Sequence, residues 1–484
     1  MRGIDRCRVA LFAVFGALIV AGVLTACGAS ATQDASTSTA DSAETQADDN
    51  AAIDANEAEV SEDETVAANY LDPGDDYELE QVVILSRHNI RSPLSTNGSI
   101  LDIATPHKWY EWTSEPSELS MRGGALETFM GQYVRSWLEH EGLIDHNWQP
   151  ADGEVRFYAN SKQRTIATAQ YFSGGFLPVA NVRIETKGDF DEMNPVFTPK
   201  FTFMSDAYEK AALAQIAEFG GEDGMRGVAA GLADSYKLIS DVCDIEGSEG
   251  YQSGELAALD TTDTNVVLEL DQEPAMEGSL KLATQLSDAL VLQYYEESDP
   301  VKAGFGTDLT RDQWKLISKA KDVYGDVLFT APLVAVNVAH PLLQEIEGEL
   351  SAKGRKFTFL CGHDSNIGSV LAALGVDEYE LPNAIEAKTP IGSKLVFEKW
   401  ANKDGKTYAR VRLMYQTTDQ LRDLTLLQHA EVPQTFDLTF EGLEQNADGL
   451  YAYDDLHDRI KDAIAEYDRI REEYADDVEL AEAA

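Results

Sequence analysis

The stretch Val82-Val83-Ile84-Leu85-Ser86-Arg87-His88-Asn89-Ile90-Arg91-Ser92-Pro93 joins an apolar run to a basic cluster. The apolar run is rich in β-branched side chains and predicts a buried strand. The basic cluster should follow at the carboxyl end of that strand, which is where open α/β sheets bind ligands. Because Arg87 and Arg91 carry fixed positive charges, they oppose protonation of His88. A neutral imidazole flanked by forked cationic donors suits nucleophilic attack on the phosphorus of a phosphate ester.

A second strand end carries another histidine. Lys356-Phe357-Thr358-Phe359-Leu360-Cys361 predicts a strand, followed at once by Gly362-His363-Asp364 and a helix to about Leu374. This strand–turn–helix pattern repeats the geometry expected around His88. On this stretch alone, Asp364 could instead be a helix-capping residue beside an incidental histidine.

A third strand end presents an arginine. Val155–Ala159 predicts a short strand, and Arg164 lies at the start of the helix that follows, which should run to about Phe172. A cation is unfavourable at the start of a helix unless an anion is bound there. On spacing alone, Arg164 could also be a solvated residue of the first helical turn.

The basic cluster resembles the Arg-His-Gly-x-Arg-x-Pro signature of the histidine acid phosphatases, branch 2 of the histidine phosphatase superfamily. Asn89 stands where most members have glycine. The His363-Asp364 pair follows a strand, as the second signature of the family does, and in the same order along the chain. Ser-Arg-His-Asn-x-Arg and the string Tyr158–Thr165 look most like the glucose-1-phosphatase branch, which also acts on phytate. The resemblance covers roughly Tyr77 to Tyr467.

The resemblance implies an α/β domain, with a central mixed sheet flanked by helices, into which a mostly α-helical domain is inserted. It also implies two-step hydrolysis of phosphate monoesters. His88 would attack phosphorus and become a phosphohistidine, while Asp364 would protonate the leaving alkoxide and later deprotonate the attacking water. The phosphate oxygens would be held by a set of basic residues: Arg87, Arg91, Arg164 and His363. Because Asp364 must start protonated beside a phosphate dianion, acidic conditions should favour turnover.

The predicted helical insert spans residues 202–318, where the pattern is mostly helical with Gly-rich and acidic loops. The α/β domain is then predicted at residues 77–201 and 319–484. Gln272-Glu273-Pro274 lies within the insert. The resemblance places Glu273 at a substrate-facing position, although from sequence alone it could be an exposed charge before a proline.

The amino-terminal segment predicts export. Basic residues precede an apolar run too short for a comfortable membrane span, and Leu24-Thr25-Ala26-Cys27-Gly28 looks like a lipobox. We therefore expect residues 1–27 to be a lipoprotein signal peptide and Cys27 to be diacylated at the outer face of a bacterial membrane. A simple secretory signal is the alternative. Residues 28–76 hold no Lys or Arg and predict a disordered acidic tether.

Composition narrows the possible partners. The 484-residue chain has a net charge of −47, which argues against nucleic-acid binding. An anionic substrate then requires a local basic pocket, whereas the general acidity favours solubility or an acidic or salty habitat. Cys243 and Cys361 are too few for a disulfide framework, in contrast to many secreted members of the family. The eight histidines are scattered, so neither a metal nor a cofactor is expected.

Several functions remain open. The same pocket would serve a glucose-1-phosphatase, a phytase or a broad-specificity acid phosphatase. A phosphomutase shares the nucleophile but is normally cytoplasmic, which the export signal opposes. A non-catalytic surface lipoprotein that binds phospho-sugars would need neither His88 nor Asp364. The expected partners are thus a sugar phosphate or inositol phosphate and, through Cys27, a membrane.

Overall fold

The computed structural model describes residues 73–94, 99–260, 263–428 and 430–481. The predicted signal peptide, its Cys27 and most of the predicted tether lie outside the described residues. The described residues belong to one compact unit.

A central mixed sheet of eight strands organises the chain, in the order β10-β9-β8-β1-β7-β2-β3 with β11 paired to β9. Four strands form its parallel part: β1 (Tyr77–Arg87), β7 (Phe357–Gly362), β2 (Val155–Ala159) and β3 (Ile184–Glu185). Four antiparallel strands extend it: β8 (Lys394–Asn402), β9 (Thr407–Tyr415), β10 (Gln434–Asp437) and β11 (Tyr451–Ala452). The predicted mixed sheet flanked by helices is therefore confirmed.

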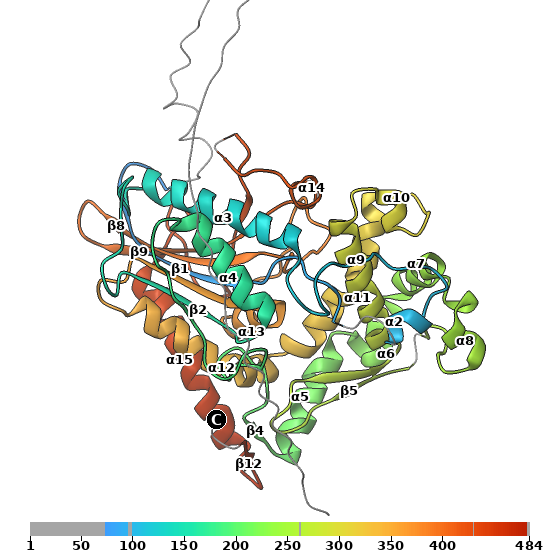
Figure 1. The fold of residues 1–484 in the computed structure, drawn as a ribbon. Helices are drawn as coiled ribbons and strands as arrows, with labels where there is room; N and C mark the ends of the chain where they lie inside the picture. The colour runs from blue at the N-terminus through green and yellow to red at the C-terminus, as the bar shows by residue number, and fades with distance from the viewer. Residues whose placement is uncertain (1–72, 95–98, 261–262, 429, 482–484) are drawn as a thin grey trace, which may run out of the picture. The chain divides into compact units, whose positions relative to one another are not determined.

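Helices cover both faces of this sheet. In Figure 1, α3 (Met121–His140) and α4 (Gln163–Phe176) lie on one face, and α12 (Pro332–Leu350), α13 (Asp364–Ala373) and α15 (Tyr453–Glu473) lie on the other. Strand β1 explains this arrangement, because side chains alternate between the two faces of a strand. Val82 and Ile84 pack in the cluster with α3 and α4, whereas Val83 and Leu85 pack with α12, α13 and α15.

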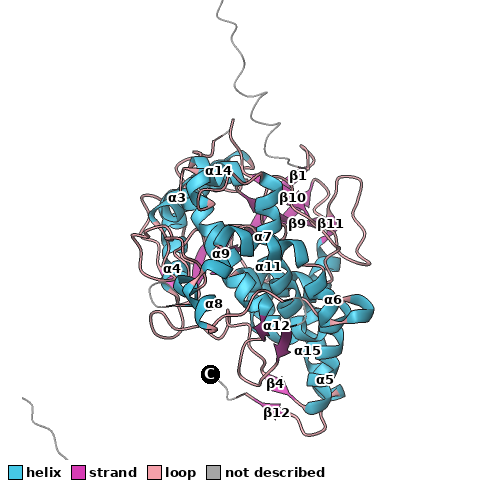
Figure 2. Ribbon diagram, turned by 90° about the vertical axis from the view of Figure 1, so that its right-hand side faces the viewer, coloured by secondary structure: helices cyan, strands magenta, loops and turns pink. Residues whose placement is uncertain are grey.

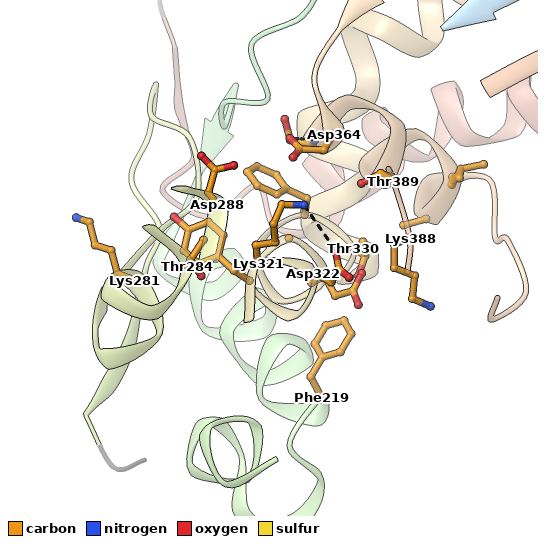
Figure 3. Close-up of a pocket in the computed structure, with 18 of the residues that line it drawn as sticks. Phe219, Lys281, Thr284, Asp288, Lys321, Asp322, Thr330, Asp364, Lys388 and Thr389 are labelled. Atoms are coloured by element: carbon orange, nitrogen blue, oxygen red, sulfur yellow. Dashed lines mark hydrogen bonds and ion pairs between the residues drawn. The ribbon is translucent and has the colours of Figure 1, made fainter. Parts of the chain in front are cut away.

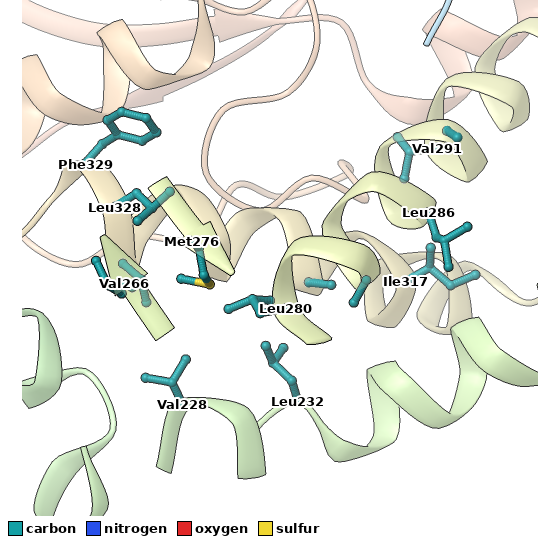
Figure 4. Packing of buried hydrophobic residues seen from close by; sticks show 14 of the residues in the cluster. Val228, Leu232, Val266, Met276, Leu280, Leu286, Val291, Ile317, Leu328 and Phe329 are labelled. Carbon is teal, nitrogen blue, oxygen red and sulfur yellow. The ribbon is translucent and has the colours of Figure 1, made fainter. Parts of the chain in front are cut away.

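A second group of helices builds its own core. Figure 2 shows α7, α9 and α11 side by side. The group comprises α5 (Asp206–Glu218), α6 (Met225–Ala230), α7 (Ala233–Cys243), α8 (Glu249–Ser253), α9 (Ser279–Glu296), α10 (Pro300–Ala303) and α11 (Arg311–Phe329). Val228, Leu232, Met276, Leu280 and Ile317 meet inside this core (Figure 4).

Smaller elements complete the fold. The helical group holds a two-stranded sheet, β5 (Thr264–Val267) with β6 (Ala275–Gly278), and β4 (Phe203–Met204) pairs with β12 (Glu479–Leu480). The short helices are α2 (Ile100–Ile103) and α14 (Thr418–Asp423), with 3₁₀ turns at Gly221–Asp223 and Ile245–Gly247. The division into a sheet domain and a helical insert at residues 202–318 stays a prediction, and α11 is continuous across residue 318.

Two further observations concern cysteine and the membrane. Cys243 and Cys361 are both buried and free, and burial raises the pKa of the Cys243 thiol to about 12. Within the described ranges, no single helix is both long and apolar enough to cross a membrane. The pair α11 and α12, bent by 84°, meets the length and composition criteria together.

Candidate active site

The predicted site residues meet at one edge of the sheet. Strand register places Arg87 beside Gly362 and Ala159 beside Cys361, so β1, β7 and β2 end together. The rings of His88 and His363, which follow β1 and β7, lie 5.5 Å apart between centroids. The parallel strands therefore assemble all three sequence motifs at their carboxyl ends, as open α/β sheets do for ligands.

His88 is held as a neutral ring with a defined tautomer. Its Nδ1 lies 2.9 Å from the carbonyl oxygen of Asn89. A carbonyl oxygen only accepts hydrogen bonds, so Nδ1 carries the hydrogen and Nε2 keeps its lone pair. Burial, followed by the charges of Arg164 and Arg91, holds the pKa of His88 well below its ordinary value. Nε2 is thus available as a nucleophile.

Three arginines surround this imidazole with unused donors. Arg87, Arg91 and Arg164 all depress the pKa of His88 electrostatically. On each of them, Nε is buried and has no hydrogen-bond partner among the described residues. A buried donor left unpaired costs about 1–3 kcal/mol. Three such donors near one nucleophile suit an anionic ligand, such as a phosphate ester with its three non-bridging oxygens.

The positive charge of Arg164 is electrostatically unfavourable in this arrangement. Burial, together with the charge of Arg91, lowers the pKa of Arg164 to about 10. It lies at the start of α4, where a cation opposes the helix dipole. Both effects are relieved by an anion bound beside it.

Arg87 is fixed from two sides. Its Nη1 donates to Glu386 Oε1 at 2.7 Å and to the carbonyl of Thr389 at 2.5 Å, and its Nη2 lies 3.1 Å from Asp364 Oδ2. Glu386 also accepts from Lys321 Nζ at 2.6 Å. Burial opposes ionisation of Glu386, but Lys321 and Arg87 lower its pKa to about 2. The guanidinium is therefore clamped before any ligand arrives.

The cations around Asp364 favour its ionised form. Burial would raise its pKa, but Arg87, Lys321 and His363 outweigh that effect and lower the pKa below its ordinary value. The sequence-based expectation, a protonated Asp364 beside a bound phosphate dianion, stays a prediction. Because these cations favour the carboxylate, proton donation by Asp364 requires a further negative charge beside it.

His363 is oriented by Asn160. Asn160 Oδ1 accepts hydrogen bonds from the backbone N–H groups of Ser161 and Asn194, each at 2.8 Å. These two bonds determine which atom of the side-chain amide is the oxygen and which is the nitrogen. Asn160 Nδ2 then donates to His363 Nε2 at 2.7 Å. Burial and Arg164 hold the pKa of His363 well below its ordinary value. The neutral ring therefore carries its hydrogen on Nδ1.

The structure explains how Asn89 fits at the position where most family members have glycine. Its Oδ1 accepts from the backbone N–H of Ile90 at 2.8 Å, and its Nδ2 donates to Glu127 at 2.9 Å. Glu127 is buried and pairs with Lys394 at 2.7 Å. Gly392, at φ +71°, leaves room, because a Cβ there would lie 2.4 Å from Asn89 Nδ2. Asn89 thus pins the turn that carries His88.

Two acidic residues reach the site from the helical group. Asp288 on α9 lies 3.0 Å from Arg91 Nη2. Sequence reasoning missed it, although a carboxylate in the middle of a mostly apolar helix is a usable signal. Glu273 lies in the loop between β5 and β6 and is exposed. Partial desolvation raises the pKa of Glu273. The charge of Arg164 lowers this pKa and the charge of Asp364 raises it, so Glu273 lies close enough to the site to interact with both residues.

A cavity of about 790 Å³ opens beside these residues. Arg91 and Asp364 lie on its wall. Figure 3 shows Asp364 at one end, with Asp288 and Thr284 on one side and Thr389 and Lys388 on the other. Within the part of the chain that the structure describes, no group of three His, Cys, Asp or Glu residues could hold a metal ion.

Comparison with known proteins identifies the family. The model of the histidine phosphatase superfamily (branch 2) matches residues 78–218 and 258–416. The chain belongs to this family. It is therefore a histidine-type phosphatase, a hydrolase of phosphoric monoesters.

Curated relatives within the family carry a narrower name. The chain is 36% identical to the glucose-1-phosphatase of Providencia rettgeri over 80% of this chain and 93% of that protein. It is 38% identical to the glucose-1-phosphatase of Salmonella typhimurium over 78% of this chain and 91% of that protein. Among solved structures, the phytase of Hafnia alvei in complex with myo-inositol hexakis sulphate superposes with a TM-score of 0.73. That similarity covers 81% of this phosphatase and 98% of the phytase at 26% identity.

Proposed function

We propose that this phosphatase hydrolyses glucose 1-phosphate, phytate or both through a phosphohistidine on His88. The observation that carries the proposal is the neutral Nε2 of His88 beside three arginines, each with a buried and unpaired Nε. The similarity to two glucose-1-phosphatases supports the sugar phosphate, and the likeness to a phytase structure supports phytate.

The geometry supports the following first step. Phosphate oxygens pair with Arg87, Arg91, Arg164 and His363. Nε2 of His88 then bonds to phosphorus as the phosphorus–oxygen bond to the alcohol breaks. The bound phosphate adds negative charge next to Asp364 and so raises the pKa of that carboxyl group. Protonated Asp364 donates to the departing alkoxide.

The second step releases phosphate. Asp364, now a carboxylate, removes a proton from water, and the water oxygen attacks the phosphorus of the phosphohistidine. The bond from phosphorus to His88 breaks, and the imidazole returns to its neutral form. Arg87 stays clamped by Glu386 throughout, so the charge that stabilises both transition states needs no reorganisation.

Two alternatives share this geometry. A broad-specificity acid phosphatase or phytase would use the same residues, and only a substrate panel separates it from a glucose-1-phosphatase. A surface lipoprotein that binds phospho-sugars without turnover is less favoured, because binding needs neither an available Nε2 on His88 nor a carboxylate at Asp364.

Export and anchoring belong to the same proposal. The lipobox-like sequence at Cys27 supports a lipid-anchored enzyme at the cell surface or facing the periplasm. Detergent-phase partitioning of the native protein tests the anchor. Cys27→Ala should release the protein or block its processing, and an unmodified Cys27 on a native protein would contradict the anchor.

The test of the chemistry is a rapid quench with ³²P-labelled substrate. Wild-type enzyme should trap acid-labile phosphate on His88 and release phosphate from p-nitrophenyl phosphate. His88→Ala should lose both signals while keeping its circular dichroism spectrum. The matched control is His146→Ala, since that side chain is 86% exposed. Near wild-type turnover by His88→Ala would overturn the mechanism.

A further inference from the structure

The cavity beside Asp364 lies where a leaving group must lie. A general acid contacts the oxygen that departs, so the alcohol part of the substrate extends from the phosphate toward Asp364 and beyond it. Asp364 and Arg91 form one end of the 790 Å³ cavity, and α9, α11 and α13 supply much of the rest of its lining. The cavity thus shares Arg91 with the proposed phosphate site, and it contacts the proposed proton donor Asp364.

The cavity exceeds the needs of one sugar ring. A hexose has twelve non-hydrogen atoms, which need roughly 360 Å³ even at the ~30 Å³ share of a molecule in liquid water. That is less than half of the 790 Å³ available. A leaving group with a second ring fits the space.

Charge at the far end of the cavity disfavours anionic substituents. Four acidic residues line it beyond Asp364: Asp322, Asp326, Asp377 and Glu378. Four basic residues line the cavity as well: Arg91, Lys281, Lys321 and Lys388. Lys321 donates to Glu386 at 2.6 Å, and Lys388 donates to the carbonyl of Tyr379 at 2.7 Å and lies 4.9 Å from the centre of its ring. Burial raises the pKa of Asp326 to about 6, so its charge is present above that pH. Because six acidic residues line the cavity against four basic ones, additional phosphate groups on a leaving group would meet a net negative charge at neutral pH.

Uncharged polar, aromatic and aliphatic groups make up the remaining lining. Thr284, Gln285 and Tyr324 offer a hydroxyl, an amide and a phenol, and Phe219 and Phe329 offer ring faces. Figure 3 shows Thr284 near Asp288 and Phe219 lower down, below Asp322. Pockets of mixed aromatic and hydrogen-bonding character orient neutral, polyhydroxylated ligands.

We infer that this cavity binds the leaving group and selects 1-phosphates of uncharged oligosaccharides, with Asp326, Asp377 and Glu378 acting against inositol polyphosphates. The inference rests on the proposed function and names its substrate class. The chemistry is unchanged, since the released alcohol is a disaccharide in place of glucose.

The experiment compares kcat/KM of the full enzyme for α-maltose 1-phosphate, α-glucose 1-phosphate and phytate. We expect maltose 1-phosphate to equal or exceed glucose 1-phosphate, and phytate to be at least about tenfold poorer than either, a discrimination that contacts to the leaving group can supply. Raising NaCl from 20 to 200 mM should increase the ratio of phytate to glucose 1-phosphate turnover, because salt screens repulsion.

Variants then test the acidic residues. Asp326→Asn combined with Glu378→Gln should raise the ratio of phytate to glucose 1-phosphate kcat/KM about tenfold. The control, Glu380→Gln, alters a neighbouring acid that is 71% exposed and is not part of the lining. If the double variant does not fold, the salt series on wild-type enzyme carries the same test.

Three outcomes distinguish failure of the proposed function from failure of the inferred cavity or of its acidic lining. No hydrolysis of any monoester defeats the proposed function itself. Efficient hydrolysis of glucose 1-phosphate with maltose 1-phosphate more than about tenfold worse overturns the leaving-group cavity alone. The role of the acidic lining is overturned if wild-type enzyme prefers phytate. It is also overturned if neither salt nor the double variant changes the ratio of phytate to glucose 1-phosphate kcat/KM.

Discussion

Asp364 Oδ2 lies 3.1 Å from Arg87 Nη2, so the carboxyl group proposed as proton donor is paired with a cation before substrate arrives. Burial raises the pKa of Asp364, but Arg87, Lys321 and His363 together lower it. The donor therefore has to gain its proton in the enzyme–substrate complex, where bound phosphate competes for Arg87 and adds negative charge. Substrate binding would then also protonate Asp364 and so prepare it to act as the general acid.

Asp364→Asn should affect substrates according to their leaving groups. Glucose 1-phosphate releases a basic alkoxide that needs a proton, so its kcat should fall about 10²- to 10⁴-fold, the range that general acids contribute. p-Nitrophenolate departs without that help. The rate at which p-nitrophenyl phosphate forms the phosphohistidine should therefore fall far less. Single-turnover burst measurements isolate this step from the water attack. Equal losses for both substrates would remove Asp364 from the acid role.

The strand ends could be predicted from sequence for a physical reason. A buried strand needs a continuous apolar run, and the runs before His88, Arg164 and His363 stand out against polar turns. Parallel pairing then brings their carboxyl ends together. Neither step requires knowledge of side-chain packing.

The residues that sequence analysis missed act over long sequence distances. Arg87 and Glu386 are 299 positions apart, and Glu386 lies in a loop without periodicity. Lys321 resembles any other polar residue of an amphipathic helix. Hydrophobic spacing reports which side of an element is buried and not which charge it meets. The lowered pKa of Asp364 depends on Arg87 and Lys321 as well, and hydrophobic spacing does not report such partners.

Glu386→Gln should destabilise the protein in a pH-dependent way. The folded-state pKa of about 2 lies below the ordinary 4.5. The ion pairs of Glu386 therefore stabilise the fold above about pH 4.5, and this stabilisation is lost as pH falls toward 2. Removing one partner of a buried pair costs about 3–5 kcal/mol, and the amide should cost near the lower value.

Urea unfolding at pH 7 and at pH 3 measures this effect. The free energy of unfolding should differ between wild type and Glu386→Gln at pH 7, and the difference should shrink at pH 3. Glu380→Gln, an exposed carboxylate nearby, serves as the control. A constant difference at both pH values would mean that Glu386 acts through packing and not through charge.

Asp288→Asn should tighten phosphate binding. Asp288 lies 3.0 Å from Arg91 Nη2 and competes with phosphate for that guanidinium. Arg91 keeps its bond to the carbonyl of Ser92, so it should stay in place. Charged hydrogen bonds contribute about 1.5–3 kcal/mol, so the inhibition constant for inorganic phosphate should fall about tenfold. KM should fall with it, and kcat should fall as product release slows.

A misfolded site gives the opposite pattern for Asp288→Asn, with KM and the phosphate inhibition constant both raised. Asp241→Asn, which removes half of an exposed ion pair on α7, should change neither constant. Weaker inhibition by phosphate in an Asp288→Asn variant that keeps the wild-type circular dichroism spectrum would show that Asp288 positions Arg91 and does not compete for it.

Glu273→Ala concerns substrate choice. The phosphate contacts fall on oxygens that all monoesters share, so discrimination comes from groups that meet the alcohol. Glu273 is exposed in the loop between β5 and β6, close enough to Arg164 and Asp364 to exchange charge effects with both. Its carboxylate can accept hydrogen bonds from sugar hydroxyls and repel additional phosphates. Losing a charged hydrogen bond costs about 1.5–3 kcal/mol, or roughly ten- to a hundredfold in rate.

We therefore expect Glu273→Ala to lower kcat/KM for glucose 1-phosphate within that range while phytate turnover holds or rises. p-Nitrophenyl phosphate, whose ring carries no hydroxyl groups, should be hydrolysed nearly as before. Glu277→Ala is the matched control, because Glu277 is exposed on the adjoining strand β6. A uniform loss on all three substrates would make Glu273 a structural residue. Such a loss would leave selection of the alcohol to the proposed leaving-group cavity beside Asp364, which Asp326 and Glu378 line.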